Sequence, residues 1–293
     1  MDKITRTGYG SILQTCMFFK IPYPWLPFTT LNELLGIESG IIPPSTVYPA
    51  ANYFCIGNKG HSFEPTAGGM IALKSFQHKA TDAAPFNILP FVMREPTNDL
   101  SPAERARYAL RKEVIVDGVR WIAYYLKRLD MSNVTAELLY KTVKDDGSVT
   151  VTPYVPDNSN LHPVPSELAP TGVNVTSGDY ITAQALVPLS FTRADTDELK
   201  NVANILWKNT DLAIVSELGL VTAADHRIDV TGNGGSAFSF LEAIGCQIAS
   251  HMSAFFHANT SNDGMKQVLN AGATEPLFKL ENQVINNLTL KAV

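Results

Sequence analysis

Residues 211–257 carry the strongest pattern in the chain and constrain its fold more than any other stretch. An apolar run, Asp211–Val221, is typical of a strand, and a turn leads from it to the short run Ile228–Val230. Gly232–Gly235 then interrupts the pattern. In Phe238–Phe256 the apolar residues recur at alternating spacings of three and four, which predicts a long buried helix. We therefore expect this helix to turn back at the glycines and pack on the first strand.

Two further segments predict β-hairpins. Asp117-Gly118 lies between two runs rich in β-forming residues, and Asp-Gly is a strong signal for a tight hairpin turn. Ala136–Val143 and Val149–Val155 flank a second turn that contains Gly147. Consecutive hairpins favour antiparallel pairing. The expected fold class is therefore α+β, a largely antiparallel sheet with a few packed helices and an extended N-terminal arm.

Three short segments have the capping signals of helices. Thr29–Leu35 begins with residues that cap helices and is followed by Gly36. Ser101-Pro-Ala-Glu104 matches a capping box with proline at the first helical position, and we expect its helix to run to about Leu110. Thr192–Trp207 has one apolar face, and we expect Asp195 to cap it.

Residues 1–45 are expected to form an extended arm. Prolines disfavour regular pairing here, yet large aromatic side chains are concentrated in the same segment and will leave water. The candidate interface residues are these aromatics: Phe18, Phe19, Tyr23, Trp25 and Phe28. The arm could lie across its own core or dock on a neighbouring subunit. If it docks on a neighbour, residues 1–28 should be dispensable for folding but needed for assembly.

The sequence divides into four consecutive regions. Residues 1–45 are the arm, and residues 46–156 are an antiparallel β-rich region. Residues 157–180, rich in proline and asparagine, are expected to be a loop or linker. Residues 181–293 form an α+β C-terminal region whose tail contains the alternating run Val284–Leu290.

The composition favours a subunit of an assembly. Hydrophobic residues make up 45% of the chain, enough for a sizeable core, whereas charged residues make up only 17% against about 25% in typical soluble domains. Because charged residues are depleted at the centres of protein interfaces, this deficit indicates a surface covered by neighbours. An ordinary β-rich domain with neutral loops is the alternative. With a net charge of −5 and no long basic run, we expect no direct nucleic-acid binding. Because no stretch approaches about 18 uninterrupted apolar residues, we also expect no membrane span.

Motifs for catalysis and ligand binding are not found. The glycine-rich loop Thr231–Ser236 lacks the lysine of a phosphate-binding loop, and the six histidines have no zinc-ligand spacing. The three cysteines, Cys16, Cys55 and Cys246, are expected to be buried free thiols. We therefore expect no enzyme activity, no cofactor, no metal and no small-molecule ligand.

Two rival functions remain open. The first is a hydrolase-type enzyme that uses His226 with Asp225 or Glu217, which would require these groups to converge in one concave site. The second is a carbohydrate- or host-binding module, which would present tryptophan and tyrosine side chains on a rigid exposed face.

Several segments of the sequence resemble segments of known proteins. They are the apolar run Leu212–Leu220 with its Asp-containing turn, Glu242 followed by the expected long apolar helix, and the segments Trp121–Asp130 and Tyr53–His61. In these segments the chain resembles structural proteins of tailed bacteriophage virions. The resemblance implies a contractile-tail subunit at the baseplate or its junction with tube and sheath, or alternatively a neck or connector protein. Its partners would be other virion structural proteins and copies of itself, in a virion assembled in the host cytoplasm.

Overall fold

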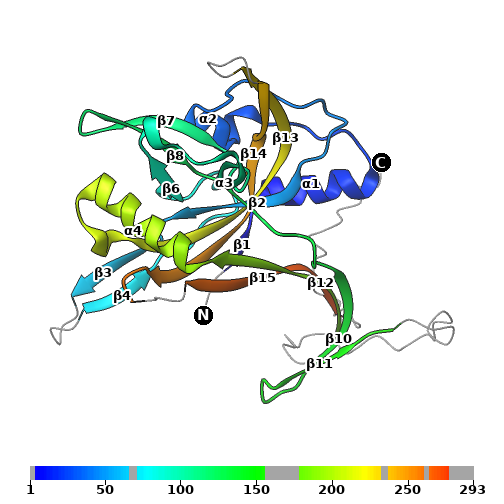
Figure 1. The fold of residues 1–293 in the computed structure, drawn as a ribbon. Helices are drawn as coiled ribbons and strands as arrows, with labels where there is room; N and C mark the ends of the chain where they lie inside the picture. Colours follow the sequence, from blue (N-terminus) through cyan, green and yellow to red (C-terminus); the bar gives the residue numbers. More distant parts are fainter. Residues whose placement is uncertain (1–3, 66–70, 156–177, 232–236, 261–263, 277–293) are drawn as a thin grey trace. The chain divides into compact units, whose positions relative to one another are not determined.

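The computed structural model describes residues 4–65, 71–155, 178–231, 237–260 and 264–276 of the 293-residue chain (Figure 1). They form a mixed α+β structure with mostly antiparallel sheets, which confirms the expected fold class. The chain separates into two compact units. The first comprises Met1–Asp130 and Leu189–Gln267, and the second comprises Met131–Pro188 and Val268–Val293. Each unit thus combines separated stretches of sequence.

The elements follow one another as short strands and helices with two long strands near the end. The helices are α1 (Gly8–Phe19), α2 (Leu31–Leu35), α3 (Pro102–Arg105) and α4 (Arg193–Trp207). The strands are β1 (Ile4–Arg6), β2 (Ala50–Gly57), β3 (His61–Pro65), β4 (Ile71–Ser75), β5 (Ile88–Leu89), β6 (Val92–Arg94), β7 (Arg111–Val116), β8 (Val119–Tyr124), β9 (Lys127–Arg128), β10 (Ala136–Val143), β11 (Val149–Pro153), β12 (Gly178–Phe191), β13 (Ile214–Thr231), β14 (Ala237–His257) and β15 (Met265–Pro276).

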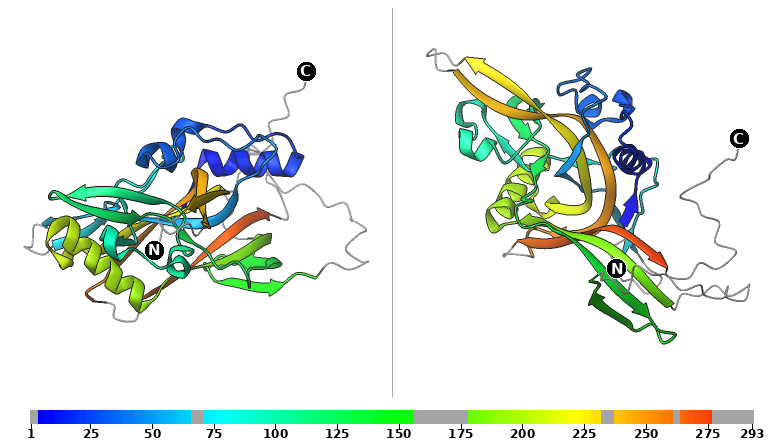
Figure 2. Two further views of the ribbon diagram at one scale, coloured as in Figure 1. Left: turned by 45° about the horizontal axis from the view of Figure 1, so that its top comes forward. Right: turned by 90° about the vertical axis from the view of Figure 1, so that its right-hand side faces the viewer.

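The main sheet of the first unit is built on the pair β13–β14. Its strand order is β1-β14-β13-β2-β5, with β9 also paired to β2, and the neighbours are antiparallel. Figure 2 shows β13 and β14 side by side along their length. The same unit contains the three-stranded sheet β6-β8-β7 and the hairpin β3–β4. The sheet β11-β10-β12-β15 belongs to the second unit except for the end of β12, from Leu189, and the start of β15, up to Gln267.

The predicted helix Phe238–Phe256 is wrong, because this segment lies within strand β14. Residues 242–248 are buried on both faces of the strand, and a strand covered on both faces reads as a continuous apolar run that also fits a helical spacing. The runs Asp211–Val221 and Ile228–Val230 belong to one strand, β13, which contains register shifts where β-bulges interrupt the pairing. The expected hinge Gly232–Gly235 lies outside the described residues.

The N-terminal region is not extended throughout. Strand β1 pairs with Ser250–Met252 of β14, and Thr7 caps helix α1 while its backbone N–H donates to Ala249 O at 3.0 Å. Helix α1 lies close against β14, since a Cβ on Gly10 would come within 2.6 Å of Ala249 O. These contacts make the first residues part of the fold, so the idea that residues 1–28 can be removed without cost loses its basis.

The capped helices predicted from the sequence are present with small shifts. Thr30 caps α2, and Gly36 ends it in the left-handed conformation at φ 64°. The capping box of Ser101 and Glu104 is formed, but helix α3 ends at Arg105 rather than near Leu110. In α4 the capping residue is Thr192, and Asp195 closes the box from the third helical position.

Both predicted hairpins are confirmed. Asp117 and Gly118 link β7 to β8 with φ values of 50° and 78°, the positive angles that a type I′ turn requires. Strands β10 and β11 pair from Val143↔Val149 to Leu139↔Pro153, as the second hairpin predicts. The predicted linker at residues 157–180 lies outside the described residues except for Gly178–Tyr180, which begin β12.

The close approach of α1 to β14 gives a test of the N-terminal packing. Gly10→Ala should lower the free energy of unfolding by about 1–3 kcal/mol, because the new Cβ meets backbone that cannot move aside easily. The matched control is Gly8→Ala, whose Cβ would meet only an ordinary contact of 3.8 Å with Ala80 O. Denaturation followed by tryptophan fluorescence reports on the first unit, which holds Trp25, Trp121 and Trp207. Equal stability of the two variants would show that α1 does not pack as described.

Candidate functional site

The five predicted interface aromatics separate into two groups. Phe18, Phe19 and Phe28 are exposed, at 79%, 56% and 92% of their surface, whereas Tyr23 is buried at 1% and Trp25 is half-buried. The exposed rings have apolar neighbours in the same segment. We call this set the N-terminal apolar surface, and it consists of Met17, Phe18, Phe19, Ile21, Leu26 and Phe28, each at least 41% exposed.

Tyr23 and Trp25 hold this segment on strand β14. The Tyr23 hydroxyl donates to Gln247 Oε1, and its ring meets the Trp25 ring edge-on at a centroid distance of 4.9 Å. Trp25 lies over Gly245, where a Cβ would come within 2.2 Å of the indole ring. Burial raises the pKa of Tyr23 to about 12, so its hydroxyl stays protonated as a donor. The exposed phenylalanines are therefore carried by a segment with its own anchors in the core.

The residues of the hydrolase hypothesis do not converge. Glu217 and Asp225 lie on the same strand, β13, eight positions apart, which corresponds to about 25 Å along a strand. Asp225 accepts hydrogen bonds from the Tyr53 hydroxyl at 2.6 Å and from Arg128 at 2.8 Å. His226 follows Asp225 and pairs across the ladder with Glu242. Glu217 belongs to a different, buried cluster.

That cluster is centred on His78, which sequence spacing alone did not connect to any site. Its Nε2 lies 2.9 Å from Glu217 Oε1 and its Nδ1 lies 2.9 Å from Asp82 Oδ2. Its ring stacks between Phe86 and His251, at centroid distances of 4.0 and 3.8 Å. Both nitrogens face carboxylates, which accept hydrogen bonds when ionised, so the geometry favours the doubly protonated imidazolium. Burial opposes this charge, but the two carboxylates outweigh it and raise the pKa of His78.

Glu217 is enclosed by backbone. Its carboxylate accepts from Lys59 N at 2.9 Å and from Phe86 N at 2.6 Å, and it is 1% exposed. Gly57 and Gly60 leave room for it, since a Cβ on either would come within 2.6 Å of the Glu217 side chain. A carboxylate with this many donors and no opening to solvent is suited to holding segments together, and it is not accessible as a general base.

His251 is the neutral partner of the stacked pair. Its Nε2 lies 3.2 Å from Asp82 O, which can only accept, so Nε2 carries the proton and the buried Nδ1 has no hydrogen-bond partner in the described structure. Burial, together with the neighbouring His78, lowers the pKa of His251 to about 4. A histidine held neutral in the fold should make the protein sensitive to acid.

The lowered pKa of His251 predicts that the contribution of this residue to stability is lost between about pH 6.5 and 4, whereas the raised pKa values of His78 and Glu242 act in the opposite direction. In this range the unfolded chain binds a proton at His251 that the folded chain does not, so stability falls as the pH falls, by up to about 2–3 kcal/mol. His251→Gln keeps a donor for Asp82 O but cannot titrate, so over this window its free energy of unfolding should fall less steeply with falling pH than that of the wild type. An unaltered slope in His251→Gln would contradict the assignment.

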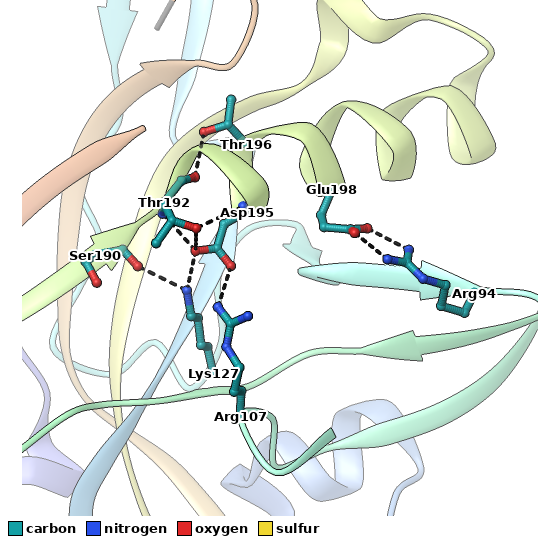
Figure 3. A network of polar contacts seen from close by, with 8 residues as sticks. All are labelled: Arg94, Arg107, Lys127, Ser190, Thr192, Asp195, Thr196 and Glu198. Carbon is teal, nitrogen blue, oxygen red and sulfur yellow. Dashed lines mark hydrogen bonds and ion pairs between the residues drawn. The ribbon is translucent and has the colours of Figure 1, made fainter. Parts of the chain in front are cut away.

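A second buried network joins helix α4 to strand β9 (Figure 3). The carboxylate of Asp195 accepts from Lys127 Nζ at 2.6 Å and from Arg107 at 3.1 Å, and it also accepts from Thr192 N and Oγ1, both at 2.8 Å. Lys127 also donates to Ser190 O at 3.2 Å. Burial would raise the pKa of Asp195, but Lys127 and the Thr192 donors outweigh it and keep the pKa below its usual range. Every oxygen of this carboxylate is satisfied, which is typical of a structural ion pair.

The Lys127–Asp195 pair predicts a large cost for removing one charge. Lys127→Met should lower the free energy of unfolding by about 3–5 kcal/mol, because Asp195 would remain buried with its main partner lost. Lys74→Met is the matched control, since Lys74 and Glu64 are both more than half exposed and such pairs contribute about 0–1 kcal/mol. Chemical denaturation of both variants makes the comparison, and similar losses would argue against a buried pair.

A cavity of about 380 Å³ lies beside strand β14 in the first unit. Its lining includes Arg105, Tyr108, Arg128 and Phe240. The Arg105 guanidinium carbon lies 3.3 Å from the centre of the Phe240 ring, and this arginine also pairs with Glu242 at 3.3 Å. Burial raises the pKa of Glu242 to about 7 despite Arg105. Both arginines of the cavity are engaged by carboxylates of the same unit, Arg105 by Glu242 and Arg128 by Asp225.

Within the described residues, no group of histidine, cysteine and acidic side chains could hold a metal ion. Cys16, Cys55 and Cys246 are free and buried, as expected from the sequence. Burial raises the pKa of the Cys55 and Cys246 thiols well above the usual range, which makes these two thiols unreactive. Among the helices in the described part of the chain, none is long and apolar enough to cross a membrane.

Comparison with known proteins gives a family without an assigned function. No curated protein matches the chain, and no solved structure matches it. A family model described as "Family of unknown function (DUF7208)" matches residues 1–285. Because this match covers nearly the whole sequence, the chain belongs to the DUF7208 family.

Proposed function

We propose that this protein is a non-enzymatic structural subunit of a phage virion, in the tail baseplate or tail junction, and that it acts through protein–protein interfaces. The observation that carries the proposal is the N-terminal apolar surface. Phe18 and Phe28 are 79% and 92% exposed, although the intervening Tyr23 is buried. A segment that anchors one aromatic in the core and leaves others in solvent is suited to contact with a partner.

The physical gain from covering this surface supports the proposal. Burying a phenylalanine side chain contributes about 1.5–3 kcal/mol, so each exposed ring that a partner covers adds to the stability of an interface. Phe18 and Phe19 already contact each other edge-on, at 5.0 Å between ring centroids. Two rings held in contact lose less conformational freedom on binding than two independent ones.

The virion setting rests on the sequence resemblance of residues 211–257 to structural proteins of tailed phages. The predicted helix of that stretch is a strand, so the resemblance is one of sequence and not of that element. The low share of charged residues, 17%, fits a chain with much of its surface in contact with neighbours. The partners in this proposal are other virion structural proteins and copies of the chain itself, assembled in the host cytoplasm. A neck or connector position is the alternative within the same proposal.

The test uses substitutions in the exposed rings. The triple variant Phe18→Ser, Phe19→Ser, Phe28→Ser should fold normally, because none of these side chains is buried, but it should enter particles at least tenfold less well than the wild type. Each variant is supplied to cells in which particles form without this protein. The measurement is the amount of the variant in the purified particles. Ile115→Ser is the matched control, since Ile115 is 72% exposed on strand β7 and outside the N-terminal apolar surface.

Two results would contradict the proposal. Normal incorporation of a folded triple variant would show that the surface is not an interface in the particle. Absence of the wild-type chain from purified particles would remove the virion setting itself.

A further inference from the structure

The outer edge of strand β11 is unpaired within the described residues. In the sheet β11-β10-β12-β15, β11 is the end strand and pairs with β10 only. All five of its residues, Val149–Pro153, are exposed, and Val149 and Val151 are 52% and 51% exposed. An exposed strand edge presents unpaired N–H and C=O groups that can pair with another strand.

The hydrogen bonds at the two ends of the hairpin show which backbone groups face outward. Lys144 N donates to Ser148 O at 2.9 Å, and Tyr154 N donates to Leu138 O at 2.9 Å. In an antiparallel ladder, hydrogen-bonded and non-hydrogen-bonded pairs alternate, so Thr150 and Thr152 direct their backbone groups toward β10. Val149 and Val151 therefore direct both their N–H and C=O groups away from β10, to the open side.

Apart from Pro153 at its end, this edge lacks the charged residues and β-bulges by which proteins protect an end strand. Its sequence, Val-Thr-Val-Thr-Pro, has no charged residue, and its β-branched residues favour pairing. Pro153, at its end, lacks an N–H and limits pairing beyond Thr152. The open donors and acceptors are thus confined to Val149 and Val151, apart from the single acceptor of Pro153.

We propose that β11 pairs antiparallel with β11 of a second copy of this chain, with the two-fold axis at Thr150. In this register Val149 of each copy lies opposite Val151 of the other, and these two pairs exchange four hydrogen bonds. Every outward N–H and C=O of both valines is then satisfied. A symmetric register centred on Val151 instead places Val149 opposite Pro153, and because Pro153 has no N–H, the outward C=O of Val149 is left without a donor.

The side chains agree with this register. Val149 and Val151 lie on the same face of the sheet as Leu139, Lys141 and Val143, given the pairs Leu139↔Pro153, Lys141↔Val151 and Val143↔Val149. A two-fold axis perpendicular to the sheet keeps this face continuous, so the valines of the two copies would form one apolar row. On the opposite face the two Thr150 side chains would meet each other. The pairing brings no like charges together, since β11 itself is uncharged.

This inference rests on the proposed function in one respect, because it names a second copy as one of the partners of an assembly subunit. It is tested on the purified full-length chain alone. The proposed function is tested by incorporation into particles, so failure of one is distinguishable from failure of the other.

In the proposed register, Thr150 of one copy lies opposite Thr150 of the other, and the test uses this pair. Thr150→Lys and Thr150→Glu should each weaken self-association about fivefold, because identical charges would face each other across the axis. An equimolar mixture of the two variants should restore association to at least the wild-type level. Sedimentation velocity over a concentration series at low salt gives the dissociation constants, and circular dichroism checks that the variants are folded.

The matched controls are charge substitutions at the neighbouring Thr152, and a second test removes a backbone N–H at Val151. Thr152→Lys and Thr152→Glu carry the same charges on the same strand face but lie opposite Ser148 of the partner copy, so neither should be rescued by mixing. Val151→Pro removes an outward donor that the chain's own sheet does not use, and it should weaken association at least about tenfold while leaving the fold intact.

Three results would overturn the proposal. They are a wild-type chain that stays monomeric over the whole concentration series, undiminished association of a folded Val151→Pro variant, and a Thr150→Lys and Thr150→Glu mixture no stronger than either variant alone.

Discussion

The pairing of β13 with β14 is the interaction on which the first unit depends. β13 accepts β2 on its other side, and β2 in turn pairs with β5 and β9. β14 receives β1 and the close contact of α1, and the Asn32 side chain of α2 bonds to Ala243 O and Cys246 N at 2.9 and 2.8 Å. Segments that are distant in sequence therefore meet on this pair. A change that slips its register would displace both neighbouring layers.

Buried carboxylates connect these layers, and each has its own set of donors. Glu217 on β13 holds the loop that contains His78 and Phe86, and Asp195 on α4 holds Lys127 of β9. Glu242 on β14 receives Arg105 and the backbone N–H of Arg111. An unpaired charge in a protein interior is costly, so such groups persist only where a second element supplies the partner. The polar interior thus fixes which loops meet which strands, while apolar packing supplies most of the stabilisation.

Local signals predicted the parts of the fold that depend on neighbouring residues. The turn at Asp117-Gly118, the Ser101 capping box and the amphipathic α4 required only a few adjacent side chains. The nature of β14 could not be read in the same way. Its apolar run fits the period of a helix as well as that of a buried strand. Whether it forms a helix or a strand depends on Asn32, Ala109 and Tyr23, which contact it from distant parts of the chain. Tertiary contacts decided the structure there.

The candidate site was predictable only in part, for the same reason. Sequence reasoning identified the aromatic segment, but only the structure separates Tyr23 in the core from Phe18 and Phe28 in solvent. The His78 cluster had one local signal, Asp82 four residues later, whereas its other members come from β13 and β14. The open edge of β11 follows from the hairpin register, which the turn at residues 144–148 sets.

Strand β12 has a mechanical consequence. Its residues up to Pro188 belong to the second unit, and Leu189–Phe191 belong to the first. The next residue, Thr192, caps α4 and donates to Asp195, which is bound to Lys127. A pull on the second unit would therefore reach, along this one of the three chain crossings between the units, a helix N-terminus held by a buried ion pair.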